Sequence, residues 1–287
     1  MGSSANDALV GMAAFVTGGA GGIGGASARW LARDGASVTI MGRTEEKLRN
    51  TVKELEEVKH EGAVIQYIVG DASKGDDVKK GIEFASKPTG TLNMCVATVG
   101  GGTTMPFLMM TEEVYLGDLR NNMLPPFLAI KYAAPVMAAN GGGSIVLISS
   151  DSARMSWPNL AAYCAGKAGL EAMMRVAADE LGHLQVRVNA VRPGLVKAGS
   201  SSRMFEDKEA LKKFVVEKPL GRTGVPDDIA AGVRYLAGPE SSWVTGQSFA
   251  IEGGNELRKA PDLGDVVRRR YGDDAVDAAL AGRIPNE

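Results

Sequence analysis

Short runs of apolar residues recur along the chain and alternate with longer segments in which apolar and polar positions mix at helical spacing. A short apolar run bounded by glycine or polar turn residues is typical of a buried strand, whereas apolar positions three or four residues apart are typical of a helix. The apolar runs predict strands over residues 13–17, 38–41, 64–69, 92–99, 144–148, 186–191 and 247–251. The mixed segments predict helices over residues 26–33, 44–59, 76–86, 111–139, 160–181, 208–217 and 226–236.

This alternation of strands and helices, with short connections, predicts an α/β fold with a doubly wound parallel sheet that helices cover on both faces. One predicted helix contains Pro125 and Pro126 in its interior. Because consecutive prolines remove backbone hydrogen bonds, we expect that helix to kink or restart near Asn122. The loop from Arg192 to about Asp207 is too long to be a mere connector.

The predicted elements divide the chain into three parts. Residues 1–7 are expected to form a flexible N-terminus, and residues 8–255 hold every predicted strand and form one domain. Residues 256–287 are rich in charge and have one expected short helix near 273–280. We interpret this C-terminal extension as a lid over the substrate or as part of an interface between subunits.

The composition disfavours several classes of function. The net charge is −2 over 287 residues with both signs interspersed, so no nucleic-acid-binding patch is expected. No apolar run approaches the roughly 18 residues that a membrane span needs. Cys95 and Cys164 lack metal-like spacing, and His60 and His183 match no motif, so we expect no metal site and a cytoplasmic protein with reduced thiols.

A glycine-rich loop follows the first predicted strand, with the pattern Thr17-Gly18-x-x-x-Gly22-x-Gly24. Glycines let the backbone turn tightly and approach a pyrophosphate, and the N-terminus of the following helix favours its negative charge. Such a pattern is weak alone, since glycines also serve ordinary turns. At the first strand–helix turn of an alternating chain, it predicts dinucleotide binding.

The end of the second predicted strand bears on which dinucleotide binds. An NAD site usually offers a carboxylate there to the ribose 2′-hydroxyl, but the strand ends in Met41-Gly42-Arg43-Thr44. Arg43 can hold a 2′-phosphate through two hydrogen bonds, so the sequence favours NADP(H). NAD(H) stays open, because Arg43 is alternatively a surface arginine near the adenine.

Tyr163 and Lys167 stand four residues apart at the start of a predicted helix, so they share one helix face. Ser150 lies just beyond the predicted strand over residues 144–148. A hydroxyl at a strand end and a Tyr/Lys pair on the next helix can together form a proton-handling site. Cys164 points about 100° away from its neighbour Tyr163, which disfavours a catalytic thiol there.

These motifs together resemble those of the classical short-chain dehydrogenase/reductase family. The resemblance covers about residues 8–255 and rests on Thr17-Gly18-x-x-x-Gly22-x-Gly24, Ser150, Tyr163-x-x-x-Lys167 and Asn189-x-x-x-Pro193-Gly194. It implies a single Rossmann domain with a seven-stranded parallel sheet. It also implies a homotetramer assembled through the two long central helices, with a small-molecule substrate.

The resemblance implies a role for each matching residue. Tyr163 corresponds to the general acid/base, Lys167 to its partner that also holds the nicotinamide ribose, and Ser150 to the residue that orients the substrate oxygen. Asn122 corresponds to the helix asparagine that supports a proton-relay water, although its neighbour Asn121 stays open. The cofactor-binding set it implies is Thr17, Gly18, Gly22, Ile23, Gly24, Arg43, Asp71, Ala72, Tyr163, Lys167, Pro193, Gly194 and Val196.

The chain departs from the family pattern at two places. The Asn-Asn-Ala-Gly that ends strand four in the family is Ala97-Thr98-Val99-Gly100 here, so side-chain amides that usually brace the sheet are missing. The threonine expected four residues after Gly194 is Ala198, and Ser200, Ser201 and Ser202 are candidates to replace it. Both departures concern cofactor binding more than the reaction.

The Tyr/Lys pair suits hydride transfer because proton transfer must accompany it. A free tyrosine has a pKa near 10 and is a poor base at pH 7. An ammonium about 5 Å away favours the phenolate by roughly 3 kcal/mol, or about two pKa units. We therefore expect the pKa of Tyr163 to be lowered, with Ser150 and Tyr163 both bound to the carbonyl oxygen of a substrate.

Specificity is expected to come from loops at the carboxyl ends of the strands. Those loops carry thioethers and aromatic rings, which favour an apolar, bulky alcohol or ketone of steroid, terpenoid or 3-oxoacyl type. The tentative substrate residues are Met105, Met155, Trp157 and Met204. The alternative for each is packing in the core or in an interface.

Two other functions stay open from the sequence. An enoyl- or dienoyl-thioester reductase would usually show an altered Tyr/Lys spacing, which this chain lacks. A non-catalytic, cofactor-sensing protein would keep the fold without turnover, and the altered segment Ala97-Thr98-Val99-Gly100 leaves that reading open.

Overall fold

A single seven-stranded sheet organises the computed structural model, which describes residues 7–198 and 201–285. All pairs of neighbouring strands are parallel, in the order β3-β2-β1-β4-β5-β6-β7. The strands are β1 (Ala13–Thr17), β2 (Ser37–Gly42), β3 (Ile65–Val69), β4 (Met94–Ala97), β5 (Gly143–Ile148), β6 (Val186–Pro193) and β7 (Ser248–Ile251). The predicted α/β fold with a doubly wound parallel sheet is therefore confirmed.

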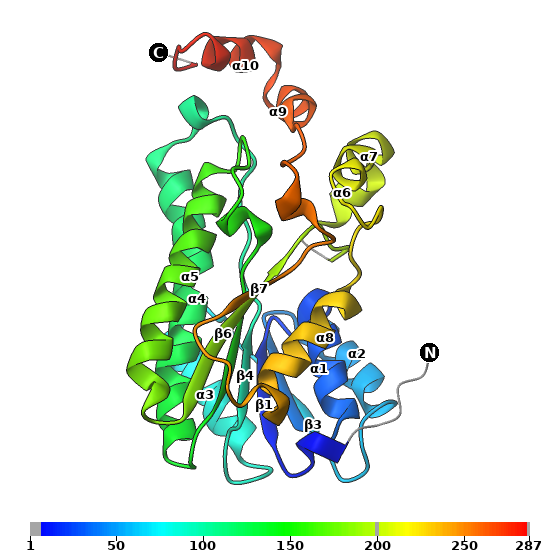
Figure 1. Cartoon of the computed structure of the whole chain (residues 1–287), viewed down its shortest axis with the longest axis vertical. Helices are drawn as coiled ribbons and strands as arrows, with labels where there is room; N and C mark the ends of the chain where they lie inside the picture. The colour runs from blue at the N-terminus through cyan, green and yellow to red at the C-terminus, as the bar shows by residue number, and fades with distance from the viewer. Residues whose placement is uncertain (1–6, 199–200, 286–287) are drawn as a thin grey trace.

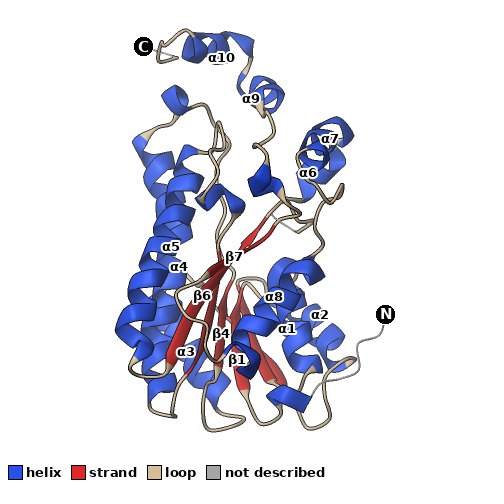
Figure 2. Cartoon of the chain, in the orientation of Figure 1, coloured by secondary structure: helices blue, strands red, loops and turns tan. Residues whose placement is uncertain are grey.

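Helices cover both faces of this sheet (Figures 1 and 2). On one face lie α3 (Gly75–Ser86), α4 (Glu112–Ala138) and α5 (Ala161–Gly182), and on the other lie α1 (Gly22–Arg33), α2 (Glu45–Glu56) and α8 (Pro226–Ala237). Each face of the sheet has its own hydrophobic core: the first lies under α3, α4 and α5, and the second under α1, α2 and α8. Successive side chains of β1 point to opposite faces, so Phe15 packs in the first core while Ala14 and Val16 pack in the second. Burial on both faces explains why the strands read as continuous apolar runs.

The helix α4 runs unbroken from Glu112 to Ala138 with three prolines inside it, whereas a kink or a restart was expected near Asn122. The restart expected near Asn122 does not occur. Pro125 and Pro126 are buried in the helix, as are Asn122 before them and Leu128 after them. Packing along α5 and the sheet therefore outweighs the backbone hydrogen bonds that the prolines remove.

The C-terminal extension holds more structure than the one predicted helix. The short helix η5 (Asn255–Leu257) leads to α9 (Gly264–Tyr271), which the sequence analysis did not predict, and to the expected α10 (Asp273–Leu280). Figure 1 shows these helices, in orange and red, beyond the carboxyl ends of the strands. The long loop after β6 contains α6 (Ser202–Glu206), followed by α7 (Lys208–Val216).

Candidate active site

Ser150, Tyr163 and Lys167 converge beyond the carboxyl end of β5. Ser150 is the N-cap of the 3-10 helix η3 (Asp151–Ala153), and its oxygen accepts a hydrogen bond from the backbone N–H of Ser152 at 3.2 Å. The phenol of Tyr163 hydrogen-bonds with the Ser150 side chain. Lys167 lies one turn further along α5, with Nζ 5.7 Å from the centre of the Tyr163 ring. The i, i+4 spacing therefore places both side chains at one site.

Asn122 of α4 joins this site through the loop that follows β4. Its side-chain N–H donates to the carbonyl oxygen of Gly101 at 2.7 Å, and the N–H of Gly101 donates back to its Oδ1 at 3.2 Å. A Cβ atom on Gly100 would lie 2.8 Å from Asn122 Oδ1 and 2.9 Å from Lys167 Nζ. The loop thus brings Asn122 and Lys167 together over a glycine. Asn122 is fully buried whereas Asn121 is exposed.

Burial changes the pKa of both members of the Tyr/Lys pair. It raises the pKa of the Tyr163 phenol to about 12, and the interaction with Ser150 only partly opposes this rise. It lowers the pKa of Lys167 to about 8, and the Lys167 ammonium donates a hydrogen bond to the carbonyl oxygen of Ile148 at 2.8 Å. The expected lowering of the Tyr163 pKa is therefore wrong for the protein without ligands. The desolvation of the phenol exceeds the opposing interaction with Ser150.

The glycine-rich loop between β1 and α1 fits a bound pyrophosphate. Gly18 has a φ of +66°, and a Cβ atom on Gly24 would lie 2.3 Å from the carbonyl oxygen of Gly18. The N-cap of α1 is Gly21, which offers no side-chain hydrogen bond to the first N–H groups of the helix. Those N–H groups, with Gly22 and Ile23 in the first turn, can donate hydrogen bonds to a bound anion.

Thr98 links β4 to β1 in this chain, which lacks the side-chain amides that usually brace the sheet in the family. Its hydroxyl donates to the carbonyl oxygen of Thr17 at 2.6 Å, and its N–H donates to Thr17 Oγ1 at 3.4 Å. A Cβ atom on Gly18 would lie 2.4 Å from the Thr98 hydroxyl oxygen. Thr98 therefore ties the end of β4 to the start of the glycine loop, a role that its polarity and strand-end position could have indicated.

Arg43 and Asp71 lie at the adjoining ends of β2 and β3. Arg43 is exposed, and within residues 7–198 and 201–285 it has no hydrogen-bond or ion-pair partner. The Asp71 carboxylate accepts hydrogen bonds from the N–H and hydroxyl of Ser73, and these bonds, helped by the charge of Arg43, lower its pKa. Ala72 is buried in the first core, so only its backbone is available to a ligand.

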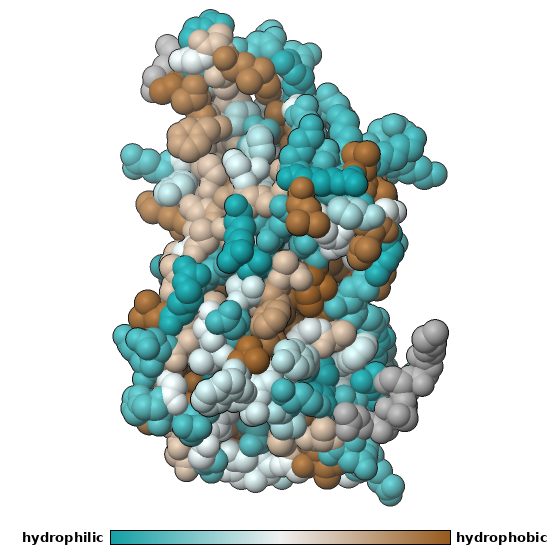
Figure 3. Space-filling view, viewed as in Figure 1, coloured by the Kyte–Doolittle hydropathy of each residue, from teal (hydrophilic) through white to brown (hydrophobic). Residues whose placement is uncertain are grey.

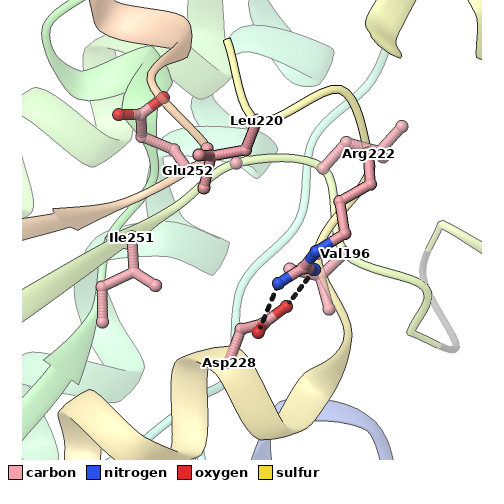
Figure 4. A pocket seen from close by; sticks show the side chains of 10 residues that line it. Val196, Leu220, Arg222, Asp228, Ile251 and Glu252 are labelled. Carbon is pink, nitrogen blue, oxygen red and sulfur yellow. Dashed lines mark hydrogen bonds and ion pairs between the residues drawn. The ribbon is translucent and has the colours of Figure 1, made fainter. Parts of the chain in front are cut away.

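The turn after β6 brings Pro193, Gly194 and Val196 to the same edge of the sheet. Gly194 and Val196 line a cavity of about 160 Å³, across which Arg222 and Asp228 form an ion pair at 2.6 Å (Figure 4). Ser201 donates its hydroxyl to the carbonyl oxygens of Val196 and Ala198 and accepts from the N–H of Ala198. Ser201 thus braces the turn, while Ser200 lies outside the described residues.

Three of the four tentative substrate residues belong to a third, smaller core. Trp157 is buried against Phe214 of α7, with ring centres 5.8 Å apart, and Leu263 of the C-terminal extension packs on the same cluster. Met155 and Met204 pack around them, while Met105 donates its N–H to the carbonyl oxygen of Asn159. The extension therefore helps build the surroundings of the site.

A cavity of about 770 Å³ lies beside this third core, between the segment over residues 156–164 and the C-terminal helices. Its lining includes Phe107, Trp157 and Leu280, and Phe107 and Leu280 are about three-quarters exposed. Figure 3 shows hydrophobic residues at the upper end of the molecule, over the C-terminal extension. Apolar surface is thus available between the start of α5 and the C-terminal helices.

Two buried charge clusters near the site were not predicted. Arg192 of β6 forms an ion pair with Glu256 at 2.7 Å and lies 3.8 Å from Glu171. Lys218, just beyond α7, donates to Asn255 Oδ1 at 2.8 Å. Both contacts anchor the start of the C-terminal extension. Residues so distant in sequence give no local signal of such pairing.

Two kinds of feature do not occur in the described part of the chain. It contains no group of three or more His, Cys, Asp and Glu side chains placed to hold a metal ion. None of its helices is both long and apolar enough to cross a membrane.

Comparisons with known proteins identify the family. A family model described as enoyl-(acyl carrier protein) reductase matches residues 18–256. A tropinone reductase homolog of Arabidopsis thaliana is 34% identical over 86% of this chain and 92% of its own length. L-rhamnose-1-dehydrogenase of Scheffersomyces stipitis is also 34% identical, over 86% of this chain and 96% of its own.

Two further proteins carry the family's name. Human dehydrogenase/reductase SDR family member 4 is 31% identical over 90% of this chain and 92% of its own length. The solved structure of a short-chain type dehydrogenase/reductase from Mycobacterium ulcerans has a TM-score of 0.89 and 33% identity, covering 94% of this chain and 98% of that chain. The chain belongs to the short-chain dehydrogenase/reductase family and is an NAD(P)-dependent oxidoreductase.

Proposed function

We propose that this protein transfers a hydride between NADP(H) and an apolar secondary alcohol or ketone, with Tyr163 as the general acid/base. The convergence of Ser150, Tyr163, Lys167 and Asn122 carries the proposal. A phenol, an ammonium and a hydroxyl at one site are the groups that a carbonyl–alcohol conversion needs, because the reacting oxygen must gain or lose a proton.

Each of these residues has a distinct task in the proposal. When bound, the nicotinamide supplies or accepts the hydride. Tyr163 gives a proton to the substrate oxygen in reduction and removes it in oxidation, while Ser150 holds that oxygen in position. Lys167 stabilises the phenolate by its charge, and Asn122 fixes the loop around Gly101 that borders the site.

The first test removes the proposed acid/base. Tyr163→Phe is expected to lower kcat by about 10²–10⁴, because the aromatic ring stays and only the proton donor is lost. Turnover is measured with a panel of apolar alcohols and ketones and with both cofactors. Tyr115→Phe, the same change at an exposed position of α4, is the matched control. Retention of full activity in Tyr163→Phe would overturn the assignment. Cofactor binding by the wild type without turnover of any substrate would favour the sensing role.

The preference for NADP(H) rests on Arg43, which is exposed beside Asp71 and makes no hydrogen bond or ion pair among the described residues. A guanidinium recognises a phosphate through paired, charge-assisted hydrogen bonds. Arg43→Ala is expected to raise KM for NADPH about tenfold or more and to leave KM for NADH nearly unchanged. Equal effects on both cofactors, or none on either, would contradict the proposal.

The apolar class of substrate is supported by the third core and by the cavity of about 770 Å³ beside it. Apolar lining and methionine side chains suit bulky, weakly polar ligands. The candidates are steroid or terpenoid alcohols and ketones and 3-oxoacyl thioesters. A panel graded from such compounds to sugars tests this class, because a preference for sugars would contradict it.

A second candidate is the reduction of a carbon–carbon double bond in an enoyl thioester. The description of the matching family model favours it. The unaltered Tyr163-x-x-x-Lys167 spacing favours carbonyl chemistry instead. Analysis of the products from a 2-enoyl thioester and from a 3-oxoacyl thioester separates the two, since only one should be consumed together with NADPH.

We further propose a cytoplasmic homotetramer that assembles through α4 and α5. Leu116 and Phe127 of α4 and Val176 of α5 expose 61%, 44% and 58% of their surface in the single chain. Apolar side chains on two long neighbouring helices suit an interface between copies. Light scattering of the purified chain measures the assembly, and a monomer at all concentrations would contradict it.

A further inference from the structure

A buried carboxylate follows the proposed substrate-orienting serine directly. Asp151 is 3% exposed, and its Oδ1 accepts a hydrogen bond from the Ser150 hydroxyl at 3.1 Å. Its second oxygen, Oδ2, is buried and has no hydrogen-bond partner among residues 7–198 and 201–285. A buried carboxylate oxygen without a partner is unusual and indicates a role beyond packing.

The Ser150 hydroxyl has a single hydrogen and two groups that compete for it. In the proposed reaction, Ser150 donates that hydrogen to the substrate oxygen, but in the structure it donates to Asp151. We propose that Asp151 is a positioning residue that decides whether the Ser150 hydroxyl faces the substrate oxygen as a hydrogen-bond donor or as an acceptor. This inference rests on the proposed function and adds a residue to it.

The groups around Asp151 allow it to change charge. Lys218, beyond α7, and Glu252, after β7, act on it with opposite charges, while Tyr163 and Cys164 of α5 also feel its charge. Burial dominates and raises the pKa of Asp151 to about 6, although Lys218 and the bond from Ser150 oppose the rise. The carboxyl therefore changes its protonation state near neutral pH.

Each protonation state gives Ser150 a different role. Ionised Asp151 holds the Ser150 hydrogen, so the serine offers only a lone pair, which suits the hydroxyl group of an alcohol substrate. Protonated Asp151 releases that hydrogen and can itself donate to Ser150 Oγ, so the serine donates to a ketone oxygen. Low pH thus favours reduction, and pH above about 6 favours oxidation.

The kinetic test follows both reaction directions from pH 5 to pH 9 in the full-length protein. In the wild type, kcat for ketone reduction is expected to fall about tenfold as Asp151 ionises, because a hydrogen bond to a charged group is stronger than one to a neutral group. Asp151→Asn should remove this pH-dependent fall and lower kcat for alcohol oxidation. Asp76→Asn, at an exposed position of α3, should reproduce the wild-type profile.

A spectroscopic test does not depend on turnover. Tyrosine labelled with ¹³C at the carbon bearing the hydroxyl reports on the Ser150–Tyr163 contact, and the signal of Tyr163 is the one that Tyr163→Phe removes. The wild type should show an inflection near pH 6 that Asp151→Asn abolishes. Lys218→Met should move the inflection to higher pH, because Lys218 favours the ionised carboxylate.

The two tests fail in different ways. Absence of the inflection in the wild type, or its persistence in Asp151→Asn, overturns the role of Asp151 whatever the reaction is. If Asp151→Asn does not fold, an unmoved inflection in Lys218→Met overturns it instead. A normal titration combined with full activity of Tyr163→Phe would overturn the proposed function alone.

Discussion

Asp151 and Lys167 are buried ionisable residues at the proposed catalytic site, and burial favours the neutral form of each. The pKa of Asp151 is raised to about 6 and that of Lys167 is lowered to about 8. Neutral forms are favoured because a charge loses its hydration when it leaves water. These pKa shifts lower the stability of the folded protein at neutral pH. Shifted pKa values of this kind are typical of sites where protons are transferred.

The shift at Asp151 predicts how stability depends on pH. The carboxyl has a pKa of about 6 in the folded protein and 3.8 as its ordinary value, so the folded state binds the proton more tightly. The stabilisation from this proton is present below pH 4 and is lost as pH rises through 6, by roughly 3 kcal/mol at most. Asp151→Asn should therefore unfold at a higher temperature than the wild type at pH 8, with a smaller gain at pH 5. A gain that is equal at both pH values would contradict this account.

Local spacing makes Ser150, Tyr163 and Lys167 predictable as a site, since a strand end and an i, i+4 pair fix their places. Their pKa values are not predictable in the same way. A Coulomb estimate from one neighbour predicted a lowered pKa for Tyr163, whereas the full surroundings raise it to about 12. The burial of Tyr163 depends on segments that are remote in sequence, such as the loop over residues 100–102, which packs against it.

The contact between α4 and α5 determines where Asn122 sits. A Cβ atom on Gly166 of α5 would lie 2.9 Å from the Cβ atom of Asn122, so the two helices approach closely at a glycine. Apolar periodicity predicts which segments form strands and which form helices, and most of the predicted elements occur in the structure. The behaviour of α4 at Pro125 and Pro126 was not predictable, because tertiary packing decides whether a helix continues through proline.

A single methyl group tests this contact. Gly166→Ala is expected to destabilise the protein by about 1–3 kcal/mol, because neither Cβ atom can move away without shifting a helix. It should also lower kcat, since Asn122 holds the loop beside Lys167. Gly117→Ala in α4 is the control, because nothing lies within 4 Å of its added Cβ, and it should gain about 0.5–1 kcal/mol. Chemical denaturation measures both, and equal effects of the two changes would refute the close approach.

Three hydrophobic cores hold the described part of the chain together, and the third joins segments that are remote in sequence. Trp157, Phe214 and Leu263 come from the segment after β5, from α7 and from the C-terminal extension. The extension is further tied down by ion pairs of Arg269 with Asp207 and of Lys213 with Asp265. Of these, only the charged character of the extension and its α10 helix were predictable.

Removal of residues 256–287 tests what the extension contributes. The truncated chain should unfold several degrees lower, because Arg192 loses Glu256 and the third core loses Leu263. KM for the substrate should rise, since Trp157 and Met155 lose part of their packing. Glu256→Gln keeps the extension and separates the lost charge from the lost cover. Unchanged kinetics together with unchanged assembly would exclude both the lid and the interface roles.

The ion pair between Arg192 and Glu256 also bears on how the protein is made. A ribosome synthesises β6 with its arginine 64 residues before the carboxylate that neutralises it. Glu171, whose carboxylate lies 3.8 Å from Arg192 in the folded protein, is synthesised before it. The native ion pair of Arg192 therefore cannot form until Glu256 has left the ribosome.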